Sequence, residues 1–412
     1  MVIVPFSQLE VAYAVFGGAG GAGGAGGAGG AGGAGGAGGA GGASGAGGAG
    51  GAGGAGGAGA AIDSPLLADA LITTRDGIVG SWQNLTLAIP HLAIEDVDNL
   101  ALWDVGVRAS VFDFELHSRL GFSTDLANPA PAKRWVALWH LAVTPPAAGI
   151  DAPAVVYEPL LKMVRPTETI FKRQLDLVAD YADLRPDRAA EILAQTGTLV
   201  PFLGAIGHLH PIRTRWTLEL LGVAFRLAQF VHYRIKHALA CRRPIELSAQ
   251  IQPMIQTPGH GSLPSGHATE AFAMAIVLLN VMRDGANPVF GQQAFAEQLL
   301  RLAARCAINR TIAGVHFPVD SVAGALLGVV LGVYLTARAT PAGTATSCAF
   351  DGEAYPEALD FKWHQVVDPA STPPAVLASG VHVTNLAALP VDAAFRSPIL
   401  DWLWNQAKKE WP

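Results

Sequence analysis

The feature that most limits what this chain can fold into is a tract of Gly-Gly-Ala repeats over residues 17–61, broken once by Ser44. Neither Gly nor Ala has a side chain large enough to build a hydrophobic core, so the tract predicts a disordered spacer without chemistry of its own. We therefore expect an N-terminal segment over 1–16, the spacer, a helical domain over 62–340 and a C-terminal extension over 341–412. The extension, which is rich in Pro and Trp, is expected to pack on the body or on a partner subunit in a homo-oligomer.

The bulk composition excludes several classes of protein. Charged residues make up 15% of the 412 residues and the net charge is −6, which predicts no broad basic surface and no nucleic-acid partner. Three cysteines without CxxC spacing predict neither a disulfide framework nor a zinc site. The N-terminus has no basic stretch before its apolar part, so it does not read as a secretion signal. The compartment, cytoplasm or periplasm, stays open.

Apolar residues recur at helical spacing along most of the globular part. Few stretches alternate strictly between apolar and polar residues, so we expect strands to be rare and the fold class to be all-α, a helical bundle. The uncharged run Ser321–Ala337 has a borderline length for a membrane span, but charges in the other apolar segments favour the buried helices of a soluble bundle without a span. Helices are predicted over residues 166–184, 185–194, 215–240, 268–282, 292–307 and 321–337.

Three short motifs place cations, histidines and a carboxylate beside the predicted helices. Each motif alone has an ordinary structural explanation: Ser265 and Gly266 suit the first turn of a helix, and a His four residues before an Asp is often a hydrogen-bonded core pair. Together they supply what an oxyanion site needs, because helix N-termini, guanidinium groups and ammonium groups all bind such anions. The motifs are Lys236 to Pro244, Pro264 to His267, and Arg310 to Asp320.

The order and spacing of the motifs, K-x6-R-P, P-S-G-H and R-x5-H-x3-D, resemble the superfamily that joins vanadium-dependent haloperoxidases, type 2 phosphatidic acid phosphatases and bacterial acid phosphatases. Asn309 stands where that pattern has Ser. The resemblance implies His316 as the vanadate ligand or the phosphorylated nucleophile, Asp320 as its hydrogen-bonding partner and His267 as the acid–base. It implies that the oxyanion is bound by Lys236, Arg243, Ser265, Gly266 and Arg310.

The motifs leave two activities open, because vanadate and phosphate share shape and charge. A long helical part before the motifs resembles the haloperoxidases, which oxidise bromide or iodide with hydrogen peroxide and pass the product to a small organic acceptor. His260, seven residues before His267, and Tyr233, one turn before Lys236, resemble the bromoperoxidase-like members and are assigned to the halide environment, although a loop histidine is the ordinary explanation of His260. Lys236 would polarise the bound peroxide.

Two alternatives to the haloperoxidase remain. One is an acid phosphatase that acts through a phosphohistidine at the same site, with phosphate in place of vanadate. The other is a non-catalytic oxyanion-binding protein, which the retention of both histidines and all three cations disfavours. His208 and His210, two residues apart, are a weak metal signal that we interpret as packing or capping.

Overall fold

The elements of the fold come from a computed structural model, which describes residues 65–83, 90–125, 134–144, 153–341, 345, 347–378, 382–386, 388–389 and 391–412. The chain divides into two units. The smaller unit contains the helix α2 (Pro65–Val79) and the 3-10 helix η2 (Val97–Leu102). The N-terminal segment and the Gly-Gly-Ala spacer of the sequence prediction lie outside the described residues.

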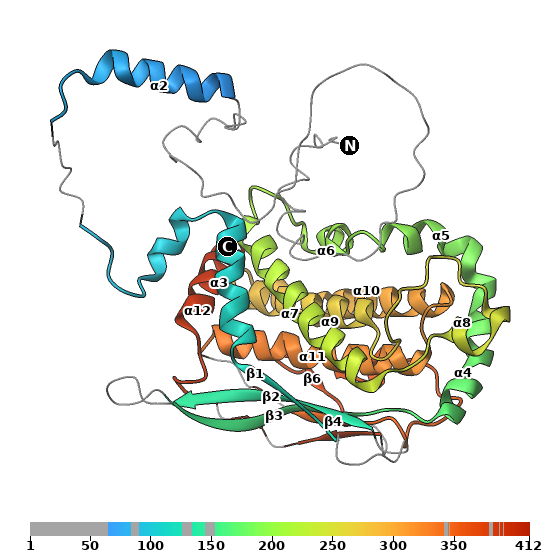
Figure 1. Cartoon of the computed structure of the whole chain (residues 1–412). Helices are drawn as coiled ribbons and strands as arrows, with labels where there is room; N and C mark the ends of the chain where they lie inside the picture. The colour runs from blue at the N-terminus through green and yellow to red at the C-terminus, as the bar shows by residue number, and fades with distance from the viewer. Residues whose placement is uncertain are drawn as a thin grey trace, which may run out of the picture. The chain divides into compact units, whose positions relative to one another are not determined.

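The helices of the larger unit form a bundle around α9 (Gly266–Asp284). The helices α7 (Arg215–Leu239), α10 (Gln293–Ile312) and α11 (Pro318–Ala339) pack on α9, as Figure 1 shows. Every residue of α11 is buried. Within the described part of the chain, α11 is the one helix long and apolar enough to cross a membrane, and its apolar window lies entirely inside the protein, as in the core helix of a bundle.

Shorter helices surround this core and confirm the predicted helical bundle. Thr167 caps α4 by accepting a hydrogen bond from the Ile170 amide, and Pro186 opens α5 at the predicted position. These helices are α3 (Val105–His117), α4 (Glu168–Asp180), α5 (Arg185–Ala194), α6 (Val200–Gly207), α8 (Pro244–Leu247) and α12 (Pro398–Lys408). Short 3-10 helices join them at η4 (Tyr181–Leu184), η5 (Ala249–Ile251), η6 (Pro288–Gly291) and η7 (Trp363–Gln365).

A five-stranded sheet on one side of the bundle shows that the all-α prediction was wrong (Figure 1). Strands β3 and β4 pair in parallel, with Leu161 opposite Cys348, and the other neighbours are antiparallel. The strand order is β1 (Leu120–Thr124), β2 (Trp135–Thr144), β3 (Ala154–Val164), β4 (Cys348–Asp351) and β7 (Val383–Asn385). Two further strands, β5 (Val367–Asp368) and β6 (Ala375–Val376), form a separate pair.

The sheet was missed because its long strands do not alternate between apolar and polar residues. In β2 the residues Val136, Ala137 and Leu138 are buried in succession, and the pairing with β3 contains a register shift at Leu138 and Trp139. A strand with apolar residues on both faces resembles a buried helix segment in its sequence pattern. The enrichment of β2 and β3 in valine and aromatic residues was the signal that favoured strands.

The C-terminal region folds back onto the bundle through α12, which packs on α7 and α9. Trp404 is buried and its indole N–H donates to Asp284 at 2.9 Å. The rings of Trp402 and Trp216 meet edge to face with centroids 5.3 Å apart. The tryptophans of the extension therefore contact the body of the same chain.

Close contact between α9 and α11 depends on three glycines spaced four residues apart on α11. A Cβ atom at Gly324 would lie 2.5 Å from the Ser265 carbonyl oxygen, and one at Gly328 would lie 2.6 Å from that of Thr269. Gly332 meets Ile276 in the same way. No real Cβ atom tolerates such distances, so the glycines let α11 lie directly against the first turns of α9, where the second motif stands.

Candidate active site

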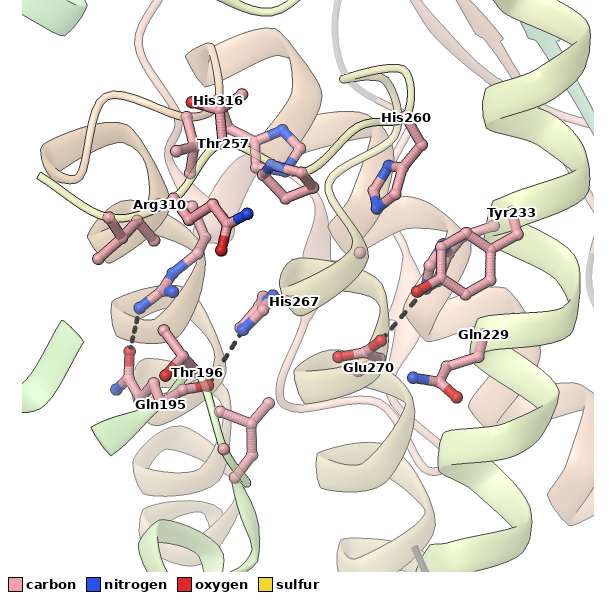
Figure 2. Close-up of a pocket in the computed structure, with 18 of the residues that line it drawn as sticks. Gln195, Thr196, Gln229, Tyr233, Thr257, His260, His267, Glu270, Arg310 and His316 are labelled. Carbon is pink, nitrogen blue, oxygen red and sulfur yellow. Dashed lines mark hydrogen bonds and ion pairs between the residues drawn. The ribbon is translucent and has the colours of Figure 1, made fainter. Parts of the chain in front are cut away.

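The bundle brings the three motifs to one cavity of about 380 Å³. Arg243 directly precedes α8, His267 stands in the first turn of α9, Arg310 lies near the end of α10 and His316 lies in the connection from α10 to α11. All four side chains line the cavity, together with Gly266, His260 and Tyr233 (Figure 2). Lys236, Ser265 and Asp320 lie behind this wall and are not among the lining residues.

His316 is held in one tautomer by its two neighbours. Its Nδ1 lies 2.9 Å from Asp320 Oδ2, and its Nε2 lies 2.9 Å from Arg243 Nη1. A guanidinium only donates, so Nε2 accepts and Nδ1 carries the proton that Asp320 accepts. Burial, helped by Arg243 and Lys236, holds the pKa of His316 well below its ordinary value. The imidazole is therefore neutral, with its basic nitrogen beside a cation at the cavity.

Hydrogen bonds fix the Asp320 carboxylate in the position from which it orients His316. Its Oδ2 also accepts from the Phe317 amide at 3.0 Å, and its Oδ1 accepts from the Ser262 hydroxyl at 3.4 Å. Burial raises the pKa of this carboxyl to about 6, although the Phe317 amide and Lys236 oppose the shift. The carboxylate is thus charged at neutral pH and orients the histidine, as carboxylates behind a reactive imidazole do.

Arg310 offers unused hydrogen-bond donors to the cavity. Its Nη2 donates to the Ile192 carbonyl at 3.1 Å and to Gln195 Oε1 at 3.2 Å. Its Nε and Nη1 are buried and have no hydrogen-bond partner among the described residues. Burial lowers the pKa of Arg310 only to about 10, so the side chain stays charged. Unpaired buried donors on a cation are costly unless an anion completes them.

His267 faces the cavity from the first turn of α9. Its Nε2 donates to the Gln195 carbonyl at 3.0 Å, because a carbonyl can only accept. Burial and the charge of Arg310 lower the pKa of His267 to about 4, so the free site holds a neutral imidazole. An anion bound at Arg310 would raise this pKa, since an opposite charge favours the protonated ring.

Lys236 and Ser265 have structural roles in this arrangement. The Lys236 ammonium donates to three backbone carbonyls, those of Gly261, Ser262 and Pro264, which uses its three N–H groups. Burial and Arg243 lower its pKa. The Ser265 hydroxyl accepts from the Ala268 amide at 3.5 Å as the N-cap of α9. Either side chain would have to exchange a partner to reach a bound anion.

His260 and Tyr233 line the cavity beside Arg243. His260 Nδ1 lies 3.1 Å from Arg243 Nη2, and the rings of His260 and Tyr233 meet edge to face with centroids 5.2 Å apart. Burial and the charge of Lys236 lower the pKa of His260 to about 4. The His260 imidazole is therefore neutral in the free site.

Three residues of the site were missed by sequence reasoning. Gln195, at the end of α5, accepts from His267 through its backbone carbonyl and from Arg310 through its side chain. Glu270 and His232 form a buried pair, with 3.2 Å between Glu270 Oε1 and His232 Nε2, and both line the cavity. The sequence could have indicated Glu270, because it stands three residues after His267 on the same helix and therefore on the same helix face. No local signal marks Gln195.

Asn309, the departure from the motif pattern, does not line the cavity. Its amide nitrogen donates to Glu191 Oε1 and to Gln195 Oε1, each at 3.0 Å, and its amide oxygen accepts from Arg188 at 3.2 Å. Asn309 therefore ties α10 to α5 and supports the same Gln195 side chain that contacts Arg310.

His208 and His210, which gave a weak metal signal in the sequence, have a local structural explanation. His210 Nδ1 accepts from the amides of Ile212 and Arg213, and His208 Nε2 lies 2.7 Å from the Arg213 guanidinium. These contacts cap a turn. The described part of the chain contains no cluster of three or more His, Cys, Asp or Glu side chains placed to hold a metal ion.

Comparison with known proteins finds a family model that is similar to the part of the chain carrying the three motifs. Residues 217–342 match the family model of the PAP2 superfamily, a range that includes all three motifs. A search of curated proteins returned no match. A solved structure, the first transmembrane PAP2 type phosphatidylglycerolphosphate phosphatase from Bacillus subtilis, is similar at 20% identity and a TM-score of 0.33 over 40% of this chain and 84% of that chain. A likeness at that level carries no functional argument.

Proposed function

We propose that this chain is a phosphomonoesterase that transfers the phosphoryl group of its substrate to His316 and then to water. The observation that carries the proposal is the neutral His316, which lines the cavity with an unprotonated Nε2 beside Arg243 while Asp320 holds Nδ1. Such a displacement requires a nucleophile, a carboxylate that orients it and cations that bind the phosphate oxygens. The PAP2-superfamily match over 217–342 is consistent with it.

In the proposed reaction the phosphate of the substrate binds at Arg310, where Nε and Nη1 have no other partner among the described residues. Bound phosphate displaces the Arg243–His316 hydrogen bond, and Arg243 turns its donors to phosphate oxygens. His316 Nε2 then forms a bond to phosphorus as the bond from phosphorus to the ester oxygen breaks. His267, protonated because the bound dianion raises its pKa, gives its proton to the leaving alcohol.

The second step returns the enzyme to its starting state. His267, now neutral, takes a proton from water as the water oxygen attacks phosphorus and the phosphorus–nitrogen bond to His316 breaks. Arg310 and Arg243 stabilise the charge that develops on the equatorial oxygens in both steps. Asp320 stabilises the positive charge on the phosphorylated ring through the Nδ1 proton.

The proposal predicts different losses for the two histidines, measured with p-nitrophenyl phosphate and with an alkyl phosphate. His316→Gln abolishes hydrolysis of both and prevents trapping of acid-labile phosphoenzyme. His267→Ala retains much of the rate of p-nitrophenolate release in the first turnover, because p-nitrophenolate leaves without a proton, but loses about 100-fold or more in first-turnover release of the alkyl alcohol. The later hydrolysis of the phosphoenzyme slows alike for both substrates, so the first turnover is the measurement. Equal first-turnover losses on both substrates in the His267 variant would contradict the assigned proton transfer.

Vanadate-dependent haloperoxidase activity, which the long helical part before the motifs, His260 and Tyr233 favoured in the sequence, remains the second candidate. The observation in its favour is His260, which lines the cavity and contacts Arg243. The same donors of Arg310 and Arg243, with His316 Nε2, fit vanadate as well as phosphate. Bound vanadate would supply a Lewis-acid centre for hydrogen peroxide, and His267 would hold the proton. Bromide or iodide oxidation with added vanadate and peroxide, without phosphate hydrolysis, would replace our proposal with this one.

A further inference from the structure

The lining of the cavity includes two arginines, Arg243 and Arg310, and one carboxylate, Glu270. Figure 2 shows Arg310 and His316 on one side of His267 and Glu270, Gln229 and Tyr233 on the other. All of these residues line the same cavity. The first side is the phosphate site of the proposed reaction. The second side is unused by that mechanism, so it is the place where the alcohol portion of a substrate would lie.

The second side is built by two helices. From α7 come Phe225, Gln229 and Tyr233, spaced four residues apart and therefore on one face. From α9 comes Glu270, which is 7% exposed and accepts from His232 Nε2 at 3.2 Å. A carboxylate and aromatic rings that line one cavity can together bind an organic ammonium ion, because the ring faces and the carboxylate all attract a cation.

The charge state of the pair supports a net negative wall. Burial alone raises the pKa of Glu270, but the hydrogen bond from His232 and the nearby His267 outweigh it and leave the pKa below its ordinary value. Burial lowers the pKa of His232, so this imidazole is neutral. A buried carboxylate is costly without a cation bound to it, and the side chains that donate to Glu270, those of His232 and Gln229, are both uncharged.

We propose that Glu270, with Tyr233 and Phe225, binds an ammonium group on the alcohol portion of the substrate, so that the preferred substrates are phosphomonoesters of amino or quaternary-ammonium alcohols. The inference rests on the proposed phosphatase activity. A zwitterionic substrate of this kind places its phosphate at Arg310 and its cation at Glu270. A second anionic group on the substrate would instead meet the Glu270 carboxylate and be rejected.

The test compares choline phosphate with neohexyl phosphate, its uncharged carbon isostere, on the full-length wild type. The two differ in charge and hardly in shape. We expect kcat/KM for choline phosphate to be at least about tenfold higher, since tenfold corresponds to about 1.4 kcal/mol. We further expect choline itself to inhibit hydrolysis of p-nitrophenyl phosphate. Equal kcat/KM for the two esters would overturn the proposal.

Two variants assign the preference to the carboxylate. Glu270→Gln keeps an oxygen that accepts from His232 but removes the charge, and we expect the ratio of the two kcat/KM values to fall to near one. Glu270→Asp keeps the charge and should retain most of the ratio. Glu297→Gln removes a carboxylate that pairs with Arg301 on the surface of α10, and it should leave both values unchanged.

The outcomes separate this inference from the activity on which it rests. Loss of activity on both esters alike in Glu270→Gln, with the ratio unchanged, would mean that Glu270 only supports His267, and it would overturn the ammonium site. If the wild type hydrolyses p-nitrophenyl phosphate but does not discriminate between the two esters, the ammonium site is wrong and the phosphatase proposal is unaffected. If the wild type hydrolyses no phosphate ester, the phosphatase proposal itself is wrong.

Discussion

At the scale of single residues, Gln195 connects two motif residues that line the cavity, His267 and Arg310. Its side-chain oxygen accepts from Arg310 Nη2 at 3.2 Å and from Asn309 Nδ2 at 3.0 Å, and its side-chain nitrogen donates to Glu191 at 3.1 Å. The side chain is 1% exposed. Gln195 is therefore a positioning residue for the guanidinium that would bind phosphate in the proposed reaction.

Gln195→Met is expected to raise KM for p-nitrophenyl phosphate about tenfold with a smaller change in kcat. Methionine keeps the volume but offers Arg310 no strong acceptor, and a hydrogen bond to a charged group contributes roughly 1.5–3 kcal/mol. The hydrogen bond to His267 uses the backbone carbonyl and persists. Steady-state kinetics and the inhibition constant of inorganic phosphate measure the effect, with the exposed Gln250→Met as control. An unchanged KM with a lower kcat would contradict the role.

At the scale of elements, the glycines of α11 set how closely α9 can approach. Gly328→Ala is expected to lower the free energy of unfolding by about 1–3 kcal/mol, because its Cβ would lie 2.6 Å from the Thr269 carbonyl oxygen and the packed helices must move apart. Thermal unfolding measures the loss. Gly106→Ala on α3 is the matched control, since a Cβ there meets nothing within 4 Å. A melting temperature for Gly328→Ala equal to that of the control would show that the helices separate at no cost.

At the scale of the whole molecule, buried neutral histidines make stability depend on pH. Burial lowers the pKa of His140 to about 3 and those of His260 and His267 to about 4. Between these values and about 6.5, the unfolded chain binds more protons than the folded one, so stability rises with pH. Asp320, whose pKa burial raises to about 6, acts in the opposite direction over about 4 to 6, as do Glu158 and Glu410, whose pKa values burial also raises. Among the described residues, the histidines whose pKa values burial lowers are more numerous.

We therefore expect the melting temperature to rise from pH 4.5 to pH 7, as measured by scanning fluorimetry in buffers of constant ionic strength. His140→Gln removes one of the contributing groups at a place remote from catalysis, where Nδ1 contacts the Tyr334 hydroxyl at 3.0 Å. The slope of melting temperature against pH should be shallower in this variant. A wild-type melting temperature that falls over this range would contradict the neutral state of the histidines.

Apolar periodicity in the sequence predicted the helices, and the spacing within the three motifs indicated most of the candidate site residues, because both are local features of the chain. The helices α4, α5, α7, α9, α10 and α11 follow from apolar periodicity, and the motif residues lie at their ends. Periodicity could not reveal the sheet, since β2 has apolar residues on both faces. Nor could it show that the donors of Lys236 are used by backbone carbonyls, because that depends on how the loop over 261–264 folds. Gln195 enters the site only through contacts that span more than 70 residues of chain.

The parallel pairing of β3 with β4 also governs when the protein can fold. Leu161 pairs with Cys348, and all three catalytic motifs lie in the chain between them. As the chain leaves the ribosome, β3 emerges first and its edge has no β4 to pair with until the whole bundle has been synthesised. Contacts of such long sequence separation form slowly, and an unpaired strand edge invites association with other chains. The sheet is therefore completed late, and a nascent chain that stalls after α11 exposes the unpaired edge of β3 although all three motifs have been synthesised.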